Sequence, residues 1–147
     1  MPRESRLKSS CNSVAFLLGC RPMEGLFERG VEEFNSRHFF EAHDVWEELW
    51  METRGENRLF YQGLIQTAVG LYHCSNGNFK GASSQLCKAV AKLERYLPAY
   101  HGIETHALVG RVRKVLSTAE MLRDGGEGGF DEDSVPQIRW KDDEHHM

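Results

Sequence analysis

Apolar residues recur at intervals of three and four along most of this chain, which is the spacing of one face of an α-helix. The pattern breaks where residues typical of turns stand, at Gly55, Asn76-Gly77-Asn78, Pro98 and Gly102. No segment keeps up the alternation of apolar and polar residues expected of a half-buried strand. The chain is therefore predicted to be all-α. Five helices are predicted, over residues 23–36, 38–52, 57–75, 79–97 and 104–124.

These helices define one helical bundle domain over residues 23–124. We expect residues 1–22 to form a poorly ordered lead-in. Residues 125–147 are expected to form a flexible acidic tail, because glycine and acidic residues dominate its first part. Four apolar residues of the tail would dock part of it on the bundle, namely Phe130, Val135, Pro136 and Ile138.

A weak internal repeat sets His38-Phe39-Phe40-Glu41-Ala42 against Asn78-Phe79-Lys80-Gly81-Ala82. Each copy follows a turn and opens a helix through an aromatic residue and a small alanine. In paired helical hairpins, such a small residue lets the two helices approach closely. Asn78 is the expected N-cap of its helix, and Gly77 before it suits a left-handed turn position. We therefore expect a compact five-helix bundle of two related hairpins plus a C-terminal helix.

Composition restricts the function only broadly. At 147 residues, with 40% hydrophobic and 27% charged residues, the chain has the profile of one soluble globular domain. The formal net charge of -4 argues against nonspecific nucleic-acid binding, which needs a basic surface. An apolar run over residues 14–20 follows basic residues, as in a signal peptide, but is too short to span a membrane. We therefore expect a cytoplasmic protein that binds neither nucleic acid nor a membrane.

The predicted helix over residues 38–52 carries a histidine inside its apolar face. A helical advance of about 100° per residue places five side chains on one stripe. They are Phe39, Ala42, His43, Trp46 and Trp50. Glu47 flanks this stripe one turn after His43, within reach of the imidazole. Asp44 and Glu48 fall on the opposite face, which we expect to be solvated.

The predicted helix over residues 57–75 is apolar around nearly its whole circumference, which is typical of a buried central helix. One narrow polar stripe interrupts it, made of Arg58, Gln62, Gln66 and His73. Gly63 and Gly70 lie close beside this stripe. Because glycine weakens a helix, we expect another helix or a ligand to approach the backbone there.

An antiparallel hairpin of these two helices would bring their polar residues together. His43 comes level with the region of Gln66, and Glu47 lies near Gln62 or Gly63. His73 falls near the start of the first helix of the pair. Polar groups inside a core are costly unless they are paired, so this cluster is either an internal hydrogen-bond network or a site.

Three interpretations of the cluster remain open. As a structural network, Glu47 would accept a hydrogen bond from one nitrogen of His43, and a glutamine or tyrosine would meet the other. As a ligand site, His43, Glu47, Arg58, Gln62, Gln66 and His73 would hold a small polar molecule such as a carboxylate or phosphate. As a catalytic site, His43, Glu47 and His73 would bind a divalent metal such as zinc or iron, or act as an acid–base group in hydrolysis. A protein-interaction bundle is a further alternative, suggested by the hairpin repeat.

The cysteines Cys11, Cys20, Cys74 and Cys87 show no C-x-x-C spacing. Disulfides and zinc-finger chemistry are therefore not expected. No serine accompanies the cluster as a nucleophile, and Cys74 points elsewhere on its helix.

The polar residues occur within blocks that resemble a known family. These blocks are F-E-A-H-x-x-W-E-x-x-W (Phe40 to Trp50), Q-G-L-I-Q (Gln62 to Gln66), L-Y-H (Leu71 to His73) and G-N-x-x-G-A (Gly77 to Ala82). In order and spacing they are similar to the domain-of-unknown-function family 309. The resemblance implies an intracellular five-helix bundle and no particular activity. Asp44 stands where the family pattern leads us to expect Glu.

Overall fold

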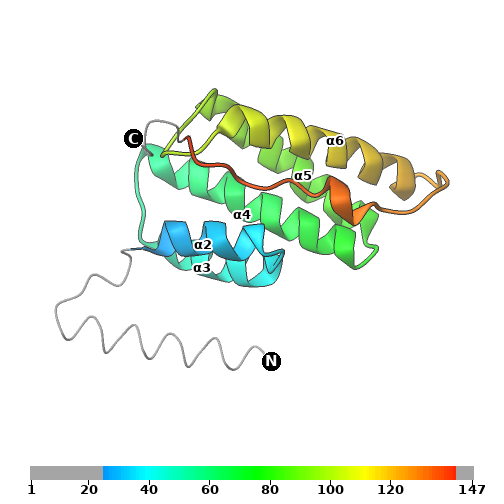
Figure 1. Cartoon of the computed structure of the whole chain (residues 1–147), viewed down its shortest axis with the longest axis horizontal. Coiled ribbons are helices and arrows are strands. Elements are labelled where there is room, and N and C mark those ends of the chain that lie inside the picture. Colours follow the sequence, from blue (N-terminus) through cyan, green and yellow to red (C-terminus); the bar gives the residue numbers. More distant parts are fainter. Residues whose placement is uncertain (1–24, 142–147) are drawn as a thin grey trace.

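The computed structural model describes residues 25–141, and within them the chain forms five α-helices (Figure 1). They are α2 (Leu26–Asn35), α3 (Phe39–Met51), α4 (Glu56–Ser75), α5 (Phe79–Leu93) and α6 (Thr105–Arg123). Short 3-10 turns follow α5 and α6, namely η1 (Glu94–Tyr96) and η2 (Glu132–Ser134). In this part of the chain, β structure is limited to the isolated bridges Tyr100–Ile103 and Ile103–Trp140. The predicted all-α bundle is confirmed; the expected lead-in, the apolar run before Cys20 and Cys11 lie outside the described residues.

Each helix packs on the next one along the chain, and α4 lies between α3 and α5 (Figure 1). The first hairpin is fastened by Trp46 of α3, which is fully buried. Its indole Nε1 donates to the carbonyl of Phe27 at 3.2 Å. Gly30 of α2 makes room for this ring, since a Cβ there would lie 2.0 Å from Trp46 Nε1. Trp46 is thus a core residue that joins α2 to α3.

The glycines of α4 mark where α5 approaches. A Cβ at Gly63 would lie 2.9 Å from Leu93 Cδ2, and one at Gly70 would lie 2.5 Å from Leu86 Cδ2. Both leucines are fully buried. Of the two partners expected from the sequence, a helix or a ligand, the structure places a helix at both glycines.

The two hairpin turns have the same backbone geometry, as the repeat suggests. Arg37 and Gly77 hold corresponding positions with φ angles of 69° and 76°. The next residues, His38 and Asn78, each donate their N–H to the carbonyl five residues earlier, at 2.8 and 2.9 Å. These bonds satisfy carbonyl groups left free at the ends of α2 and α4. The repeat in sequence is thus a repeat in structure.

The segment after α6 returns along the bundle beside that helix (Figure 1). Asn35, the last residue of α2, holds it through two hydrogen bonds to Ile138, at 3.0 and 2.8 Å. The backbone N–H of Glu104 donates to the carbonyl of Arg139 at 2.8 Å. Val135 and Ile138 are buried in the core. Among the described residues, no helix has both the length and the apolar composition needed to cross a membrane.

Candidate functional site

One face of α3 carries a row of four side chains that are not fully buried. They are Phe40, His43, Glu47 and Trp50, and their spacing of three, four and three residues keeps them on one stripe. The facing row of α4 consists of Arg58, Gln62, Gln66, Val69 and Tyr72. We call these nine residues the α3–α4 seam.

Two contacts fix the register of the seam. At one end, the Arg58 guanidinium lies 3.8 Å from the centre of the Trp50 ring. At the other end, the ring centroids of Phe40 and Tyr72 are 5.7 Å apart. The helices are therefore antiparallel, and His43 and Gln66 fall between these two contacts, as the sequence predicts.

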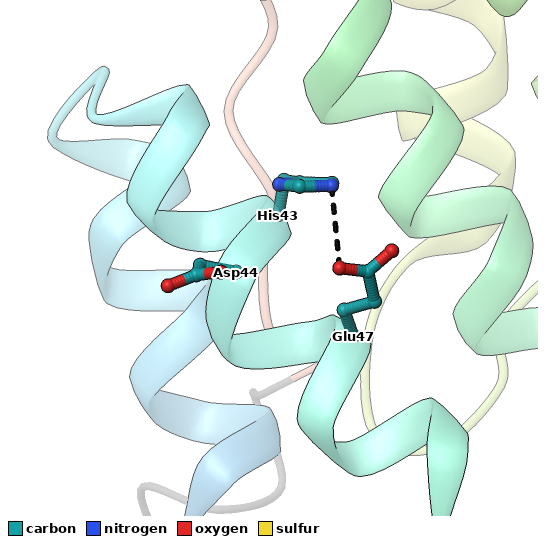
Figure 2. A group of neighbouring side chains, drawn as sticks. All are labelled: His43, Asp44 and Glu47. Carbon is teal, nitrogen blue, oxygen red and sulfur yellow. Dashed lines mark ion pairs between the residues drawn. The ribbon is translucent and has the colours of Figure 1, made fainter. Parts of the chain in front are cut away.

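His43 and Glu47 lie one helical turn apart on the α3 side of the seam, with their side chains turned toward one another (Figure 2). His43 Nε2 lies 3.6 Å from Glu47 Oε1, with the two side chains 22% and 47% exposed. That separation is too long for a hydrogen bond. The other ring nitrogen, His43 Nδ1, is buried and has no hydrogen-bond partner. The satisfied network considered in the sequence analysis is therefore not formed around this imidazole.

Two more polar atoms of the seam are buried without a hydrogen-bond partner. They are Gln66 Oε1 and Trp50 Nε1. Among the described residues, four buried side-chain polar atoms are unpartnered, and the remaining one is Thr105 Oγ1 at the start of α6. A buried polar group without a partner costs about 1–3 kcal/mol. The seam thus concentrates a cost that the rest of the described core largely avoids.

Arg58 has a structural task within the seam. Its Nη1 donates to the carbonyl of Trp50 at 2.9 Å and to that of Thr53 at 3.0 Å. Trp50 lies in the last turn of α3 and Thr53 just beyond the helix, where a cation also interacts favourably with the helix dipole. Gln62, one turn further along α4, is half-buried and makes no side-chain hydrogen bond within the described residues.

His73 is engaged in the turn between α4 and α5. Asn78 Nδ2 donates to His73 Nδ1 at 3.3 Å. In the described part of the chain, the group of three residues able to hold a metal ion is His43, Asp44 and Glu47, with ligand atoms within 4.8 Å of one another. His73 is not a member of this group, which differs in that respect from the set His43, Glu47 and His73 considered as one alternative from the sequence. Asp44 points to the α2 side of α3, whereas Glu47 points to the α4 side (Figure 2).

A second pair of polar side chains was not found by sequence reasoning. The Tyr61 hydroxyl of α4 is hydrogen-bonded to His101 Nε2 at 2.8 Å. Burial, helped by the nearby Tyr100 and Glu28, raises the pKa of Tyr61 to about 12. Burial also lowers the pKa of His101 below its ordinary 6.5, although Glu28 opposes this. Both groups are thus held neutral at pH 7, which suits a structural hydrogen bond better than a nucleophile.

The backbone at His101 explains why no sequence signal pointed to this pair. His101 has a φ of 53°, in the left-handed region, and lies in an irregular loop forty residues from Tyr61. A loop of this kind has no periodic pattern. Pro98 and Gly102, the latter also at positive φ, indicate a turn here but give no sign of a partner for Tyr61.

Cysteine chemistry is not supported by the described residues. Burial raises the pKa of the Cys74 thiol to about 12, so the thiol stays protonated at pH 7. Cys87 is exposed and unpaired. The seam therefore has no adjoining thiolate nucleophile.

Comparison with known proteins places the seam in a shared region. The chain is 26% identical over 111 residues to an uncharacterized protein of Aquifex aeolicus (strain VF5), covering 75% of this chain and 33% of that protein. It is 35% identical over 65 residues to the uncharacterized protein YpuF of Bacillus subtilis (strain 168), covering 44% of this chain and 37% of that protein. The chain thus matches about a third of the length of each relative. Residues 27–95, from α2 through the whole seam, match the family model described as a domain of unknown function (DUF309). The family indicated by the sequence is confirmed, and this chain carries a DUF309 domain over residues 27–95.

Proposed function

We propose that the α3–α4 seam binds a small polar molecule that carries both a hydrogen-bond donor and an acceptor. The observation that supports this is the set of three buried, unpartnered atoms on the seam: His43 Nδ1, Trp50 Nε1 and Gln66 Oε1. An indole N–H only donates and an amide oxygen only accepts, whereas an imidazole nitrogen takes either role. A molecule with one group of each kind would supply the partners that the protein lacks.

The end of the seam at Phe40 and Tyr72 favours a ligand with a flat apolar part. The Phe40 and Tyr72 side chains are close together and are 42% and 41% exposed. Aromatic walls with a few placed polar groups are typical of small-molecule sites. The exposed rings would pack on the apolar part of the ligand while its polar group turns toward Gln66.

The charges of the seam favour a neutral ligand over an anion. Arg58 is already bonded to carbonyl groups at the end of α3. The Glu47 carboxylate lies beside His43 and would repel an anion there. We therefore replace the carboxylate or phosphate considered from sequence with an uncharged amide-like or heterocyclic molecule.

Entry of the ligand requires side chains to turn, because the three unpartnered atoms are covered. Gln66 is unbranched, and Phe40, whose ring lies 5.6 Å from that of His43, is partly exposed. Rotamer changes of such side chains take picoseconds to nanoseconds. The movement needed is thus local and leaves α3 and α4 in place.

Benzamide is a suitable first probe, because it joins an aromatic ring to one donor and one acceptor group. We expect a ¹H–¹⁵N NMR titration of the full chain to shift amide signals of α3 and α4. The Gln66→Leu variant should lose these shifts. Gln85→Leu on α5 is the matched control, because it makes the same change outside the seam. Shifts that persist in Gln66→Leu, or no shifts with the native chain, would contradict the proposal.

A metal-dependent or acid–base hydrolase is a second candidate, supported by the group His43, Asp44 and Glu47. A zinc ion held there would keep positions open for water, as catalytic zinc sites do. Calorimetric titration with zinc separates this candidate from the one above. Binding that is lost in His43→Gln and kept in His73→Gln would support it, and no zinc binding by the native chain would remove it.

A protein-interaction role has support in exposed apolar side chains of the same helices. Phe40, Met51 and Tyr72 are each more than 40% exposed. Surface aromatics and methionines are enriched at protein interfaces. Such a role predicts that Phe40→Ser weakens capture of a partner, whereas Gln66→Leu, which changes a covered group, does not.

A further inference from the structure

A cavity of about 530 Å³ lies between α6 and the returning C-terminal segment. Its size falls within the range of small-molecule sites. None of its lining residues belongs to the α3–α4 seam. Both α6 and the returning segment lie beyond residues 27–95, the part that matches the family model. Whatever this cavity binds is therefore a separate question from the function of the seam.

The residues that line the cavity come from two elements, one face of α6 and one side of the returning segment. On α6, Ala107 and Gly110 line it with Arg111 and Lys114, at the three- and four-residue spacing of one helix face. The small residues provide space, because a Cβ at Gly110 would meet nothing within 4 Å. On the returning segment, Val135, Gln137 and Arg139 line the cavity at every second position, as expected of extended chain, and Asp133 of η2 precedes them. A face of α6 that combines small and basic residues thus lies opposite the returning segment.

The cavity is basic although the chain as a whole is acidic. Four lysine and arginine side chains line it, against the two carboxylates of Glu104 and Asp133. The formal net charge of the chain is -4. Since mixed surfaces normally intersperse the two signs, this local excess of positive charge singles out the cavity as a place for an anion.

Three of the four cations are without partners. Within the described residues, the side chains of Arg111, Lys114 and Arg139 make no hydrogen bond or ion pair. Other arginines are engaged: Arg113 pairs with Glu94, and Arg123 pairs with Asp124. On α6 itself, the two cations without such a pairing, Arg111 and Lys114, therefore both line the cavity.

The fourth cation, Arg37, holds the returning segment in place. Arg37, in the turn after α2, donates through Nη1 to the carbonyl of Glu132 at 2.8 Å. The same Nη1 lies 3.8 Å from the Glu132 carboxylate. This contact supports the segment that carries Arg139 opposite α6. Arg37 therefore acts as a positioning residue for the cavity.

We propose that this cavity binds a phosphorylated small molecule that also carries hydroxyl groups. Guanidinium groups match the oxygens of a phosphate in pairs, and an ammonium adds a point charge. Arg111, Lys114 and Arg139 would bind the phosphate. Glu104 and Asp133 would accept hydrogen bonds from hydroxyl groups, which a phosphate alone does not offer. The volume leaves room for both parts of such a ligand.

Ribose 5-phosphate is the first probe, with inorganic phosphate and ribose as its two halves. Isothermal titration calorimetry of the full chain should show binding of ribose 5-phosphate that is tighter than that of phosphate, with no binding of ribose. Arg111→Gln and Arg139→Gln should each weaken binding of ribose 5-phosphate about ten-fold or more, since each removes a charge-assisted hydrogen bond. Lys88→Gln on α5 is the matched control and should leave binding unchanged, because it removes the same charge from an exposed site outside the cavity.

Urea unfolding of the same variants separates binding from folding, and all three should unfold at the native urea concentration because these cations are exposed. Equal weakening by Lys88→Gln would show a general charge effect and overturn the proposal. Absence of binding by the native chain to both phosphate compounds at millimolar concentration would overturn it as well. If phosphate binds as tightly as ribose 5-phosphate, the role of Glu104 and Asp133 is wrong.

Discussion

Helix α4 presents two contrasting sides to its neighbours. Toward α5 it offers Gly63 and Gly70, which receive buried leucines in close contact. Toward α3 it offers Gln62 and Gln66, and the covered oxygen of Gln66 has no partner. The α5 side is built for packing, whereas the α3 side retains polar groups that packing alone does not explain. Groups kept at a cost in stability are commonly retained for function, and this contrast supports a ligand site on the α3 side.

The largest expected effect is on the α5 side, from Leu86→Ala. Leu86 is fully buried and fills the space over Gly70. Loss of the transfer free energy and the cavity left behind should lower the free energy of unfolding by about 2–5 kcal/mol. Urea unfolding measures this change. Met51→Ala on α3, at an exposed side chain, is the control and should change stability by about 0.5 kcal/mol or less. Equal effects at both positions would contradict the packing difference.

A smaller loss is expected from Gly70→Ala. The added Cβ would lie 2.5 Å from Leu86 Cδ2 and 2.6 Å from its Cγ, so the leucine must shift. Overpacking of this kind costs about 1–3 kcal/mol and outweighs the gain of about 1 kcal/mol in helix propensity. Gly110→Ala on α6 is the control, because its Cβ meets nothing, and it should gain up to about 1 kcal/mol. Thermal unfolding should show a lower stability for Gly70→Ala and a higher one for Gly110→Ala. A stabilised Gly70→Ala would show that α5 does not approach as closely as described.

On the α3 side we expect a substitution that raises, rather than lowers, the free energy of unfolding. Gln66→Leu removes a covered oxygen without a partner and keeps a similar volume. The free energy of unfolding should therefore rise by about 1 kcal/mol. Gln85→Leu, which makes the same change on α5, controls for the general effect of an added leucine. A loss of stability on Gln66→Leu would mean that the amide serves the fold, and the ligand proposal for the seam would lose its main support.

The sequence was sufficient for the helices because their apolar pattern runs over many turns. The helix predicted over residues 79–97 ends instead at Leu93, and η1 follows it as a tighter turn ahead of Pro98. A residue before proline is driven out of the helical region, which shortens helices of this kind. Boundaries depend on such local geometry, whereas the existence of a helix depends on the whole pattern.

The candidate site was predictable only where it follows helix periodicity. The rows of α3 and α4 could be aligned because each helix has a regular face. His73 was expected to join them, but its neighbour Asn78 engages it in a local turn. The basic cavity depends on the segment after α6, and the Tyr61–His101 pair depends on the loop between α5 and α6. Both are irregular segments, for which periodicity gives no information.

A third contact of α4, the hydrogen bond between Tyr61 and His101, gives the smallest and most specific prediction. Because burial lowers the pKa of His101 below 6.5, the unfolded chain takes up the proton first as the pH falls. Stability should therefore fall as the pH drops below about 6.5, until His101 is protonated in the folded chain as well. Urea unfolding at pH 7.5 and 5.5 measures this loss, which His101→Gln should reduce; an equal loss in His101→Gln would contradict the prediction.

Tyr61, the partner of His101, determines how stability depends on pH in the alkaline range. Tyr61 has a pKa raised to about 12 in the folded chain, from an ordinary 10.0, so the unfolded chain loses this proton first. The stability contributed by Tyr61 is complete below about pH 10 and is lost as the pH rises toward 12. Tyr61→Phe should remove that alkaline loss, because it has no proton to release. If the native chain and Tyr61→Phe lose stability equally between these pH values, the hydroxyl is not held neutral by burial. The contact with His101 would then be too weak to fasten this end of α4.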